Sequence, residues 1–218
     1  LVAGLRFKKL TLMMVVSLVL IGCRVGEGPQ VTAGRLDSYE LFASKYVTPR
    51  TIRVWVPEDY SANEQYDVLY MHDGQMLWDA QVAWNKQEWG IDEIVGQLLS
   101  EKKIKSCIVV GVASVSETRY ADYFPQKALK YLPDNAQPTD VTFNADNYLR
   151  FLVEEVKPLI DKEYSTNKGV DHTFVMGSSM GGLISLYALC EYPDIFGGAA
   201  CLSTHVSMIL SNELTKER

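Results

Sequence analysis

One serine stands between two glycines at a position where the sequence allows covalent chemistry. Gly177, Ser179 and Gly181 give the pattern Gly-x-Ser-x-Gly within "VMGSSMGG". A serine on a tight turn adopts a strained backbone, and flanking glycines remove the Cβ atoms that would collide with neighbouring elements. Ser179 is therefore a candidate nucleophile for acyl transfer. The N–H of Met180, at the expected start of a helix, is a candidate donor to the oxyanion.

The residues on either side of this turn fit the same interpretation. "HTFVMG" is typical of a strand that enters the turn, and "MGGLISLYALCEY" of a helix that leaves it. A strand, a turn and a helix in this order form the setting of a nucleophile elbow. The alternative is a turn rich in glycine and serine that only joins a strand to a helix. The flanking elements favour catalysis by Ser179.

A reacting serine needs a base, and the base needs an acid. His172 begins the strand whose other end carries Ser179, so we expect it to lie too far away. His72 precedes an Asp-Gly turn and is expected to make a supporting hydrogen bond. His205 reaches the correct edge of the sheet and is a possible base. Between Ser179 and His205 no acid follows a strand, because the two acids there end the preceding helix: Glu191 and Asp194.

The elements that must position these residues alternate along the chain. Residues 51–60 alternate as in a half-buried strand, and short apolar runs typical of strands buried on both faces occupy residues 66–74, 105–114, 172–179 and 196–205. Apolar residues at helical spacing predict helices near residues 91–99 and 148–160, with a bend at Pro158, and a third helix is expected to begin near Met180 and to stop before Pro193. Alternating strands and helices predict a mostly parallel α/β sheet with helices on both faces.

Two stretches carry a resemblance to a known family. "FLVEEVKPLIDKEY" and "HTFVMGSSMGGLISLYALCEYPDIFGGAACLS" resemble the esterase family of α/β-hydrolases, which includes enterochelin esterases, feruloyl and acetyl-xylan esterase modules, esterase D and mycolyltransferases. The likeness extends from about residue 48 to residue 205. It implies an α/β-hydrolase fold and a serine carboxylesterase without a metal or an organic cofactor. The family's acid and histidine follow two further strands, so we expect the chain to be incomplete at its C-terminal end, with those strands missing.

The resemblance also implies a second oxyanion donor and two substrate walls. In "YMHDGQMLWD" the family's Asp-Gly turn places the N–H of Gln75 at the oxyanion, although an ordinary reverse turn is the alternative. "TRYADYFPQKALKYL" resembles the family's Arg-x-x-Glu-Tyr loop, with Asp122 in place of glutamate. Aromatic side chains in such loops can equally serve packing. The residues expected to form the two walls are Arg119, Tyr120, Tyr123 and Phe124 on one side and Trp84 and Trp89 on the other.

The first 22 residues have a different composition from the rest. Arg6, Lys8 and Lys9 precede the apolar run "LTLMMVVSLVLIG", which is typical of a signal peptide. The run ends in "LIGC", which resembles the lipobox of bacterial lipoproteins and implies lipidation of Cys23. The alternatives are an ordinary export signal or a membrane anchor. We therefore predict a signal peptide at residues 1–22, a linker at 23–33, an esterase domain at 34–218, and an exported protein that is lipid-anchored in the bacterial cell envelope (outer membrane or periplasm).

Composition limits the partners. The 218 residues are 47% hydrophobic and 22% charged, as in a soluble domain with a sizeable core. The net charge is −6 and no run of basic residues occurs, so nucleic acid is not expected as a partner. Cys107, Cys190 and Cys201 show no metal-binding spacing, so no metal is expected.

Three functions stay open at this point. The first is ester hydrolysis through an acyl-enzyme on Ser179, acting on a small-molecule or glycan-linked ester, with carbohydrate or siderophore scaffolds favoured by the resemblance. The second is a non-catalytic surface lipoprotein that keeps the fold as a binding module. The third is an acyltransferase, in which an alcohol replaces water.

Overall fold

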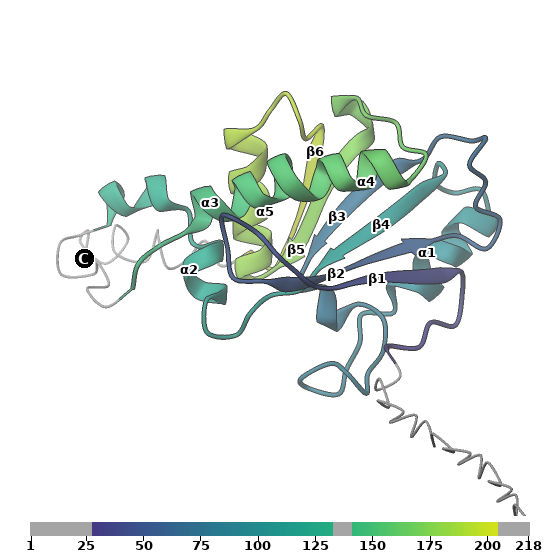
Figure 1. The fold of residues 1–218 in the computed structure, drawn as a ribbon, viewed down its shortest axis with the longest axis horizontal. Coiled ribbons are helices and arrows are strands. Elements are labelled where there is room, and N and C mark those ends of the chain that lie inside the picture. Colours follow the sequence, from purple (N-terminus) through teal and green to yellow (C-terminus); the bar gives the residue numbers. More distant parts are fainter. Residues whose placement is uncertain (1–27, 133–140, 205–218) are drawn as a thin grey trace, which may run out of the picture.

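The computed structural model describes residues 28–132 and 141–204. Six strands form one sheet in the order β1-β2-β4-β3-β5-β6 (Figure 1). The strands are β1 (Arg35–Phe42), β2 (Arg50–Val56), β3 (Asp67–His72), β4 (Cys107–Val112), β5 (Thr173–Ser178) and β6 (Gly198–Leu202). The helices are η1 (Gly74–Met76), α1 (Ile91–Ser100), α2 (Arg119–Tyr123), η2 (Gln126–Tyr131), α3 (Ala145–Arg150), η4 (Phe151–Val156), α4 (Lys157–Glu163), η5 (Val170–His172) and α5 (Met180–Glu191).

The sheet is mostly parallel, as predicted. Strands β4, β3, β5 and β6 pair in parallel, whereas β2 is antiparallel to both β1 and β4. The sequence interpretation had no strand at β1. This edge strand, "RLDSYELF", is largely polar and half exposed, so it lacks the apolar run that identified the other strands.

Side chains alternate between two cores on opposite faces of the sheet. Val54 and Val110 point into the larger core, which α3, η4, α4 and α5 cover. Their neighbours Trp55 and Val109 point into the smaller core beneath α1. Figure 1 shows α3, α4 and α5 along one face of the sheet and α1 on the other. Because both faces are covered, the central strands β3 and β4 are buried along almost their whole length, as is usual for parallel sheets.

The helix predicted near residues 148–160 is present, and it changes type just before Pro158, where the sequence predicts a bend. The chain from Ala145 to Glu163 is helical, with the π-helical segment η4 between α3 and α4. Pro158 lies in the first turn of α4, directly after this segment. Proline has no N–H and its ring clashes with the carbonyl four residues earlier, and the wider π turn accommodates both effects.

The expected linker is in part docked onto the domain. The Gln30 N–H donates to Asp79 Oδ2 at 3.0 Å and the Thr32 N–H donates to Asp92 Oδ2 at 2.8 Å. Within the two described ranges, no helix is long and apolar enough to cross a membrane. The signal peptide 1–22, Cys23 and His205 lie outside the described residues. Export and lipid anchoring through Cys23 therefore stay predictions from the sequence.

Candidate active site

Ser179 lies on a strained turn between β5 and α5. Its backbone angles are φ 57° and ψ −118°, which residues with a side chain rarely adopt. A Cβ on Gly177 would come within 2.5 Å of the Gly181 carbonyl group, so the turn closes this tightly only with glycine at position 177. The Ser179 N–H donates to the Leu202 carbonyl at 2.9 Å, which ties the turn to β6. The strand, turn and helix predicted from the sequence are present.

The turn that carries Gln75 follows β3 at the same edge of the sheet. Asp73 has left-handed angles, φ 57° and ψ 44°, and its carbonyl accepts the Met76 N–H at 2.8 Å. A Cβ on Gly74 would meet the Gly111 carbonyl carbon at 2.6 Å, so the turn lies directly on β4. The Gln75 amide oxygen accepts the Ser114 N–H at 3.0 Å, and its amide nitrogen donates to Ser114 Oγ at 2.8 Å. These bonds tie the Gln75 side chain to the chain that follows β4.

Gln75 and Ser179 line one cavity of about 590 Å³. Met180 begins α5 directly after Ser179. The first N–H groups of a helix have no partner within it, so the N–H of Met180 is available to a substrate oxygen. The structure thus brings together the predicted nucleophile and one predicted oxyanion residue in a single cavity, with the second beside them.

An ion pair that the sequence interpretation missed supports the Asp-Gly turn. Arg119 forms a bidentate ion pair with Asp73: Nε donates to Oδ1 at 2.7 Å and one terminal nitrogen donates to Oδ2 at 2.8 Å. These bonds raise the pKa of Arg119. Its guanidinium lies 5.1 Å from the centre of the Tyr123 ring. Both residues follow strands that end at one edge of the sheet, which is the signal that could have predicted the pair.

The predicted walls line the cavity only in part. Trp84, Trp89 and Arg119 contribute to the lining, and Trp84 is 79% exposed. Tyr120 and Tyr123 are not among the lining residues. Lining residues that the sequence interpretation did not name are Asp73, Met76, Val82, Asn85, Ser114, Ser116 and Ser178. Several of these follow strands or belong to the loop after β3, so the rule that sites form at strand ends could have found them.

The other residues of the loop predicted to form a wall with Arg119 make packing contacts and an ion pair. Tyr123 is fully buried, and its hydroxyl accepts the Asp73 N–H at 3.3 Å. Tyr120 packs against Phe124, with ring centres 5.8 Å apart. Asp122 is also buried and accepts a hydrogen bond from Arg50 at 3.0 Å. Tyr123 and Phe124 are thus buried, whereas Tyr120 is half-buried, and a role for the three in a substrate wall stays a prediction.

Neither described histidine can act as a base for Ser179. His72 is fully buried, its Nδ1 lies 2.7 Å from the Tyr148 hydroxyl, and burial lowers its pKa to about 4. This is the supporting hydrogen bond expected of it. His172 bonds to Asp67 at 2.6 Å, at the end of β5 opposite to Ser179.

The remaining acid and thiol side chains singled out from the sequence form no catalytic pair with Ser179 in the described part of the chain. Glu191 forms an ion pair with Lys127 at the far end of α5. The cysteines at positions 107, 190 and 201 are free thiols. Among residues 28–132 and 141–204, no cluster of three or more His, Cys, Asp or Glu side chains could hold a metal ion.

Comparisons with known proteins agree with this geometry. The family model described as "Putative esterase" matches residues 44–213. The chain is 28% identical over 174 residues to the uncharacterized protein YjcH of Bacillus subtilis, covering 79% of this chain and 63% of that protein. It is 24% identical over 166 residues to the ferri-bacillibactin esterase BesA of Bacillus subtilis, covering 73% and 50%. The chain thus spans between half and two thirds of the length of these relatives.

Among solved structures, the fold is similar to that of the BES protein from Bacillus cereus. The TM-score is 0.63 and the identity 23%, with 88% of this chain and 69% of the other covered. The likeness confirms the α/β-hydrolase fold predicted from the sequence.

Proposed function

The chain belongs to the family described as "Putative esterase", and on this premise we propose that it hydrolyses carboxylic esters through an acyl-enzyme on Ser179. The observation that carries the proposal is the joint placement of Ser179 and Gln75 in one cavity, with the start of α5 beside them. A nucleophile next to fixed backbone N–H groups is the arrangement that acyl transfer requires.

The reaction follows from this geometry in two halves. Ser179 Oγ attacks the ester carbonyl carbon while a base takes its proton, and the carbonyl oxygen becomes an oxyanion between the N–H groups of Gln75 and Met180. The oxyanion collapses, the C–O bond to the alcohol breaks, and the alcohol leaves with the proton. Water then repeats the attack on the acyl-enzyme and releases the acid. Each oxyanion donor of this kind contributes about 3 kcal/mol to stabilising the transition state.

The base is the part of the proposal that the described residues do not supply. Thr204 lies beside the first turn of α5, since a Cβ on Gly182 would meet its Oγ1 at 2.7 Å. The chain therefore leaves β6 close to Ser179, and His205 is the next residue. His205 stays the candidate base within this sequence.

The Ser179→Ala variant tests the proposal. We expect a fluorophosphonate probe to label the protein at Ser179, and expect both the labelling and the hydrolysis of 4-nitrophenyl esters to disappear in the variant. His205→Ala is the second variant, because hydrolysis that needs Ser179 and is lost on removal of His205 identifies the base. Ser185→Ala is a matched control, since its hydroxyl is buried and bonds to the Gly181 carbonyl within α5. Undiminished hydrolysis by Ser179→Ala would rule out this nucleophile.

The substrate that we propose is an ester with an aromatic acyl group, such as those on siderophore or carbohydrate scaffolds. Two tryptophans and the Arg119 guanidinium line the cavity, and such groups stack on aromatic rings. The relative BesA is named for a siderophore ester. The same hydrolysis assay, run with a feruloyl, a catecholate and an acetyl ester, ranks these classes by kcat/KM.

A non-catalytic binding module is the second candidate. It is favoured by the bonds of His72 to Tyr148 and of His172 to Asp67, which engage both described histidines elsewhere. In that case the fluorophosphonate probe leaves Ser179 unlabelled while an aryl ester still binds in the cavity.

A further inference from the structure

Residues 30–33, called the strap below, are bonded to both ends of the loop that forms one wall of the catalytic cavity. This wall loop comprises residues 79–92 and carries Trp84 and Trp89. At its start, Asp79 Oδ2 accepts the Gln30 N–H at 3.0 Å. At its end, Asp92 Oδ2 accepts the Thr32 N–H at 2.8 Å. The strap thus spans the two points where the wall loop leaves the body of the domain.

The middle of the wall loop is exposed and is held mostly by bonds within the loop, among them those from Lys86 Nζ to the Gln81 carbonyl at 2.6 Å and from the Gln87 N–H to Asn85 Oδ1 at 3.1 Å. Ala83 is buried, but residues 84–88 are all exposed to solvent. The backbone bonds that anchor this stretch are those from the Lys86 N–H to the Ala83 carbonyl at 3.0 Å and from the Trp89 N–H to the Met76 carbonyl at 2.9 Å. A segment with few buried contacts opens easily, so the position of Trp84 depends on how firmly the loop's ends are held.

The carboxylates at the two ends join the strap to the loop directly. Asp79 accepts the Gln30 N–H on one oxygen and the Gln81 N–H, at 2.7 Å, on the other, and these bonds lower its pKa. Asp92 is fully buried, which raises its pKa, while the N–H groups of Thr32 and Ala33 counteract the rise. The Thr32 hydroxyl also donates to Glu93 Oε1, in the first turn of α1, at 2.7 Å. Hydrogen bonds to carboxylates are among the stronger ones in proteins.

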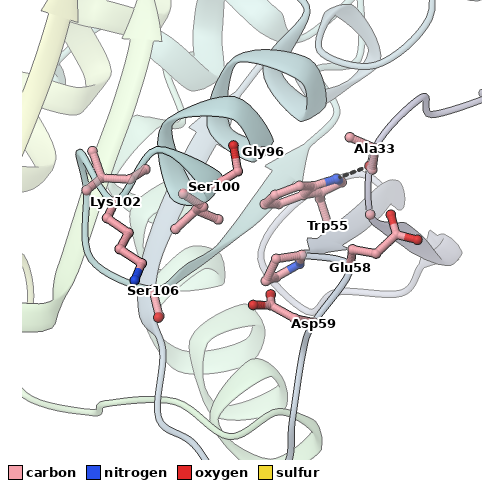
Figure 2. Close-up of a pocket in the computed structure, with 12 residues that line it drawn as sticks. Ala33, Trp55, Glu58, Asp59, Gly96, Ser100, Lys102 and Ser106 are labelled. Atoms are coloured by element: carbon pink, nitrogen blue, oxygen red, sulfur yellow. Dashed lines mark hydrogen bonds between the residues drawn. The ribbon is translucent and has the colours of Figure 1, made fainter.

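Packing connects the strap and the wall as well. Val31 and Trp89 both pack against the smaller core, which contains Trp55. The Trp55 indole N–H donates to the Ala33 carbonyl at 2.7 Å, as Figure 2 shows. This bond lies at the rim of a second cavity of about 560 Å³, which the strap borders. Displacing the strap would therefore disturb the core on which Trp89 rests.

We infer that the strap positions the wall loop, and with it Trp84 and Trp89, over the catalytic cavity. That Trp84 and Trp89 contact a substrate rests on the proposed function. Loosening the strap leaves Ser179, Gln75 and Met180 in place, so it weakens the binding of esters that reach the wall and leaves the chemical step intact. In kinetic terms it raises KM and leaves kcat unchanged.

Amide hydrogen exchange on the full chain tests the inference without relying on activity. Thr32→Pro removes both the N–H and the hydroxyl that the strap offers to α1, whereas Thr32→Ala removes only the hydroxyl. Thr166→Ala is the matched control, because its hydroxyl also donates to a carboxylate, that of Asp161, at 2.7 Å and away from the cavity. We expect exchange of residues 84–89 to be about three- to tenfold faster in Thr32→Pro, less so in Thr32→Ala, and unchanged in Thr166→Ala.

Two results would overturn the inference. One is unchanged exchange of residues 84–89 in Thr32→Pro; the other is an equal increase in Thr166→Ala, which would reflect general loosening. If Thr32→Pro does not fold, Thr32→Ala against Thr166→Ala gives the same comparison. Failure of the proposed function appears separately, as absence of labelling at Ser179, and leaves the exchange result valid. Where turnover is measurable, KM for an aryl ester rises severalfold in Thr32→Pro with kcat within about twofold of the parent.

Discussion

At the scale of single residues, the site depends on side chains that hold its backbone in place. Asp73 holds left-handed backbone angles that are unfavourable for a residue with a Cβ, and the Arg119 ion pair and the Tyr123 hydroxyl keep it there. The contacts of Asp73 with Arg119 and Tyr123 therefore stabilise the turn that contains Gln75. The sequence predicts the turn but not these contacts, because the partners are brought together only by the order of strands in the sheet.

His72 makes the stability of this region depend on pH. Burial lowers its pKa to about 4, well below the ordinary value near 6.5. Between these values the unfolded chain binds a proton that the folded chain does not, so stability is full above about pH 6.5 and falls as the pH drops toward 4. The fall contributed by this residue is about 1.4 kcal/mol per pH unit at its steepest.

Urea unfolding at pH 7, 6 and 5 measures this dependence. Carboxylates titrate in part of the same range, so the informative quantity is the difference between the parent and His72→Gln, in which the titrating group is absent. We expect the variant to be less stable at pH 7, because the His72 ring packs against Tyr123 and Tyr148, yet to lose less stability on acidification. Equal slopes for the two proteins would contradict the prediction.

At the scale of elements, the sequence predicts most of the fold because the parallel strands are buried on both faces. Strands β3 to β6 appear as apolar runs closed by small or polar residues and β2 as an alternating strand, while α1 and the helix over residues 148–160 appear at helical spacing. The edge strand β1 has no such run, and its pairing with β2 is a tertiary contact. The wall residues were harder to predict. Tyr123 and Trp84 are both aromatic and both follow strands, yet one is fully buried and the other 79% exposed.

The turn between β5 and α5 is tight enough that a side chain at Gly177 should destabilise the fold. A Cβ on Gly177 would lie within 2.5 Å of the backbone of Gly181, so Gly177→Ala must separate β5 from α5. We expect a loss of about 1–3 kcal/mol in the free energy of unfolding, as is usual for overpacking. Gly169→Ala is the control: its nearest neighbour would be a ring carbon of His172 at 3.6 Å, and its φ of −71° suits alanine. That substitution should stabilise by up to about 1 kcal/mol. Similar midpoints in urea for the two variants would show that the elbow tolerates a side chain.

At the scale of the whole molecule, the two edges of the sheet differ in character. Strand β1 presents a polar edge, "RLDSYELF", whereas β6 presents "GAACL". Within the described part of the chain, β6 pairs with β5 alone, and its last residue, Leu202, is 46% exposed. An apolar strand with unpaired N–H and C=O groups is a template for pairing with another chain. Among the described residues, the apolar edge of the sheet therefore lies on the side next to Ser179.

A charge on this edge should reduce self-association without weakening the fold. Lysine on an edge strand opposes edge-to-edge pairing, and the bond from the Ser179 N–H to the Leu202 carbonyl involves only backbone, so Leu202→Lys retains it. Leu186→Lys is the matched control, because Leu186 is 43% exposed but lies on the helix α5 and not on a strand. We expect both variants to unfold within about 0.5 kcal/mol of the parent, as exposed substitutions usually do. Light scattering on concentration should fall in Leu202→Lys and not in Leu186→Lys; an equal fall in both would attribute the effect to net charge instead of the β6 edge.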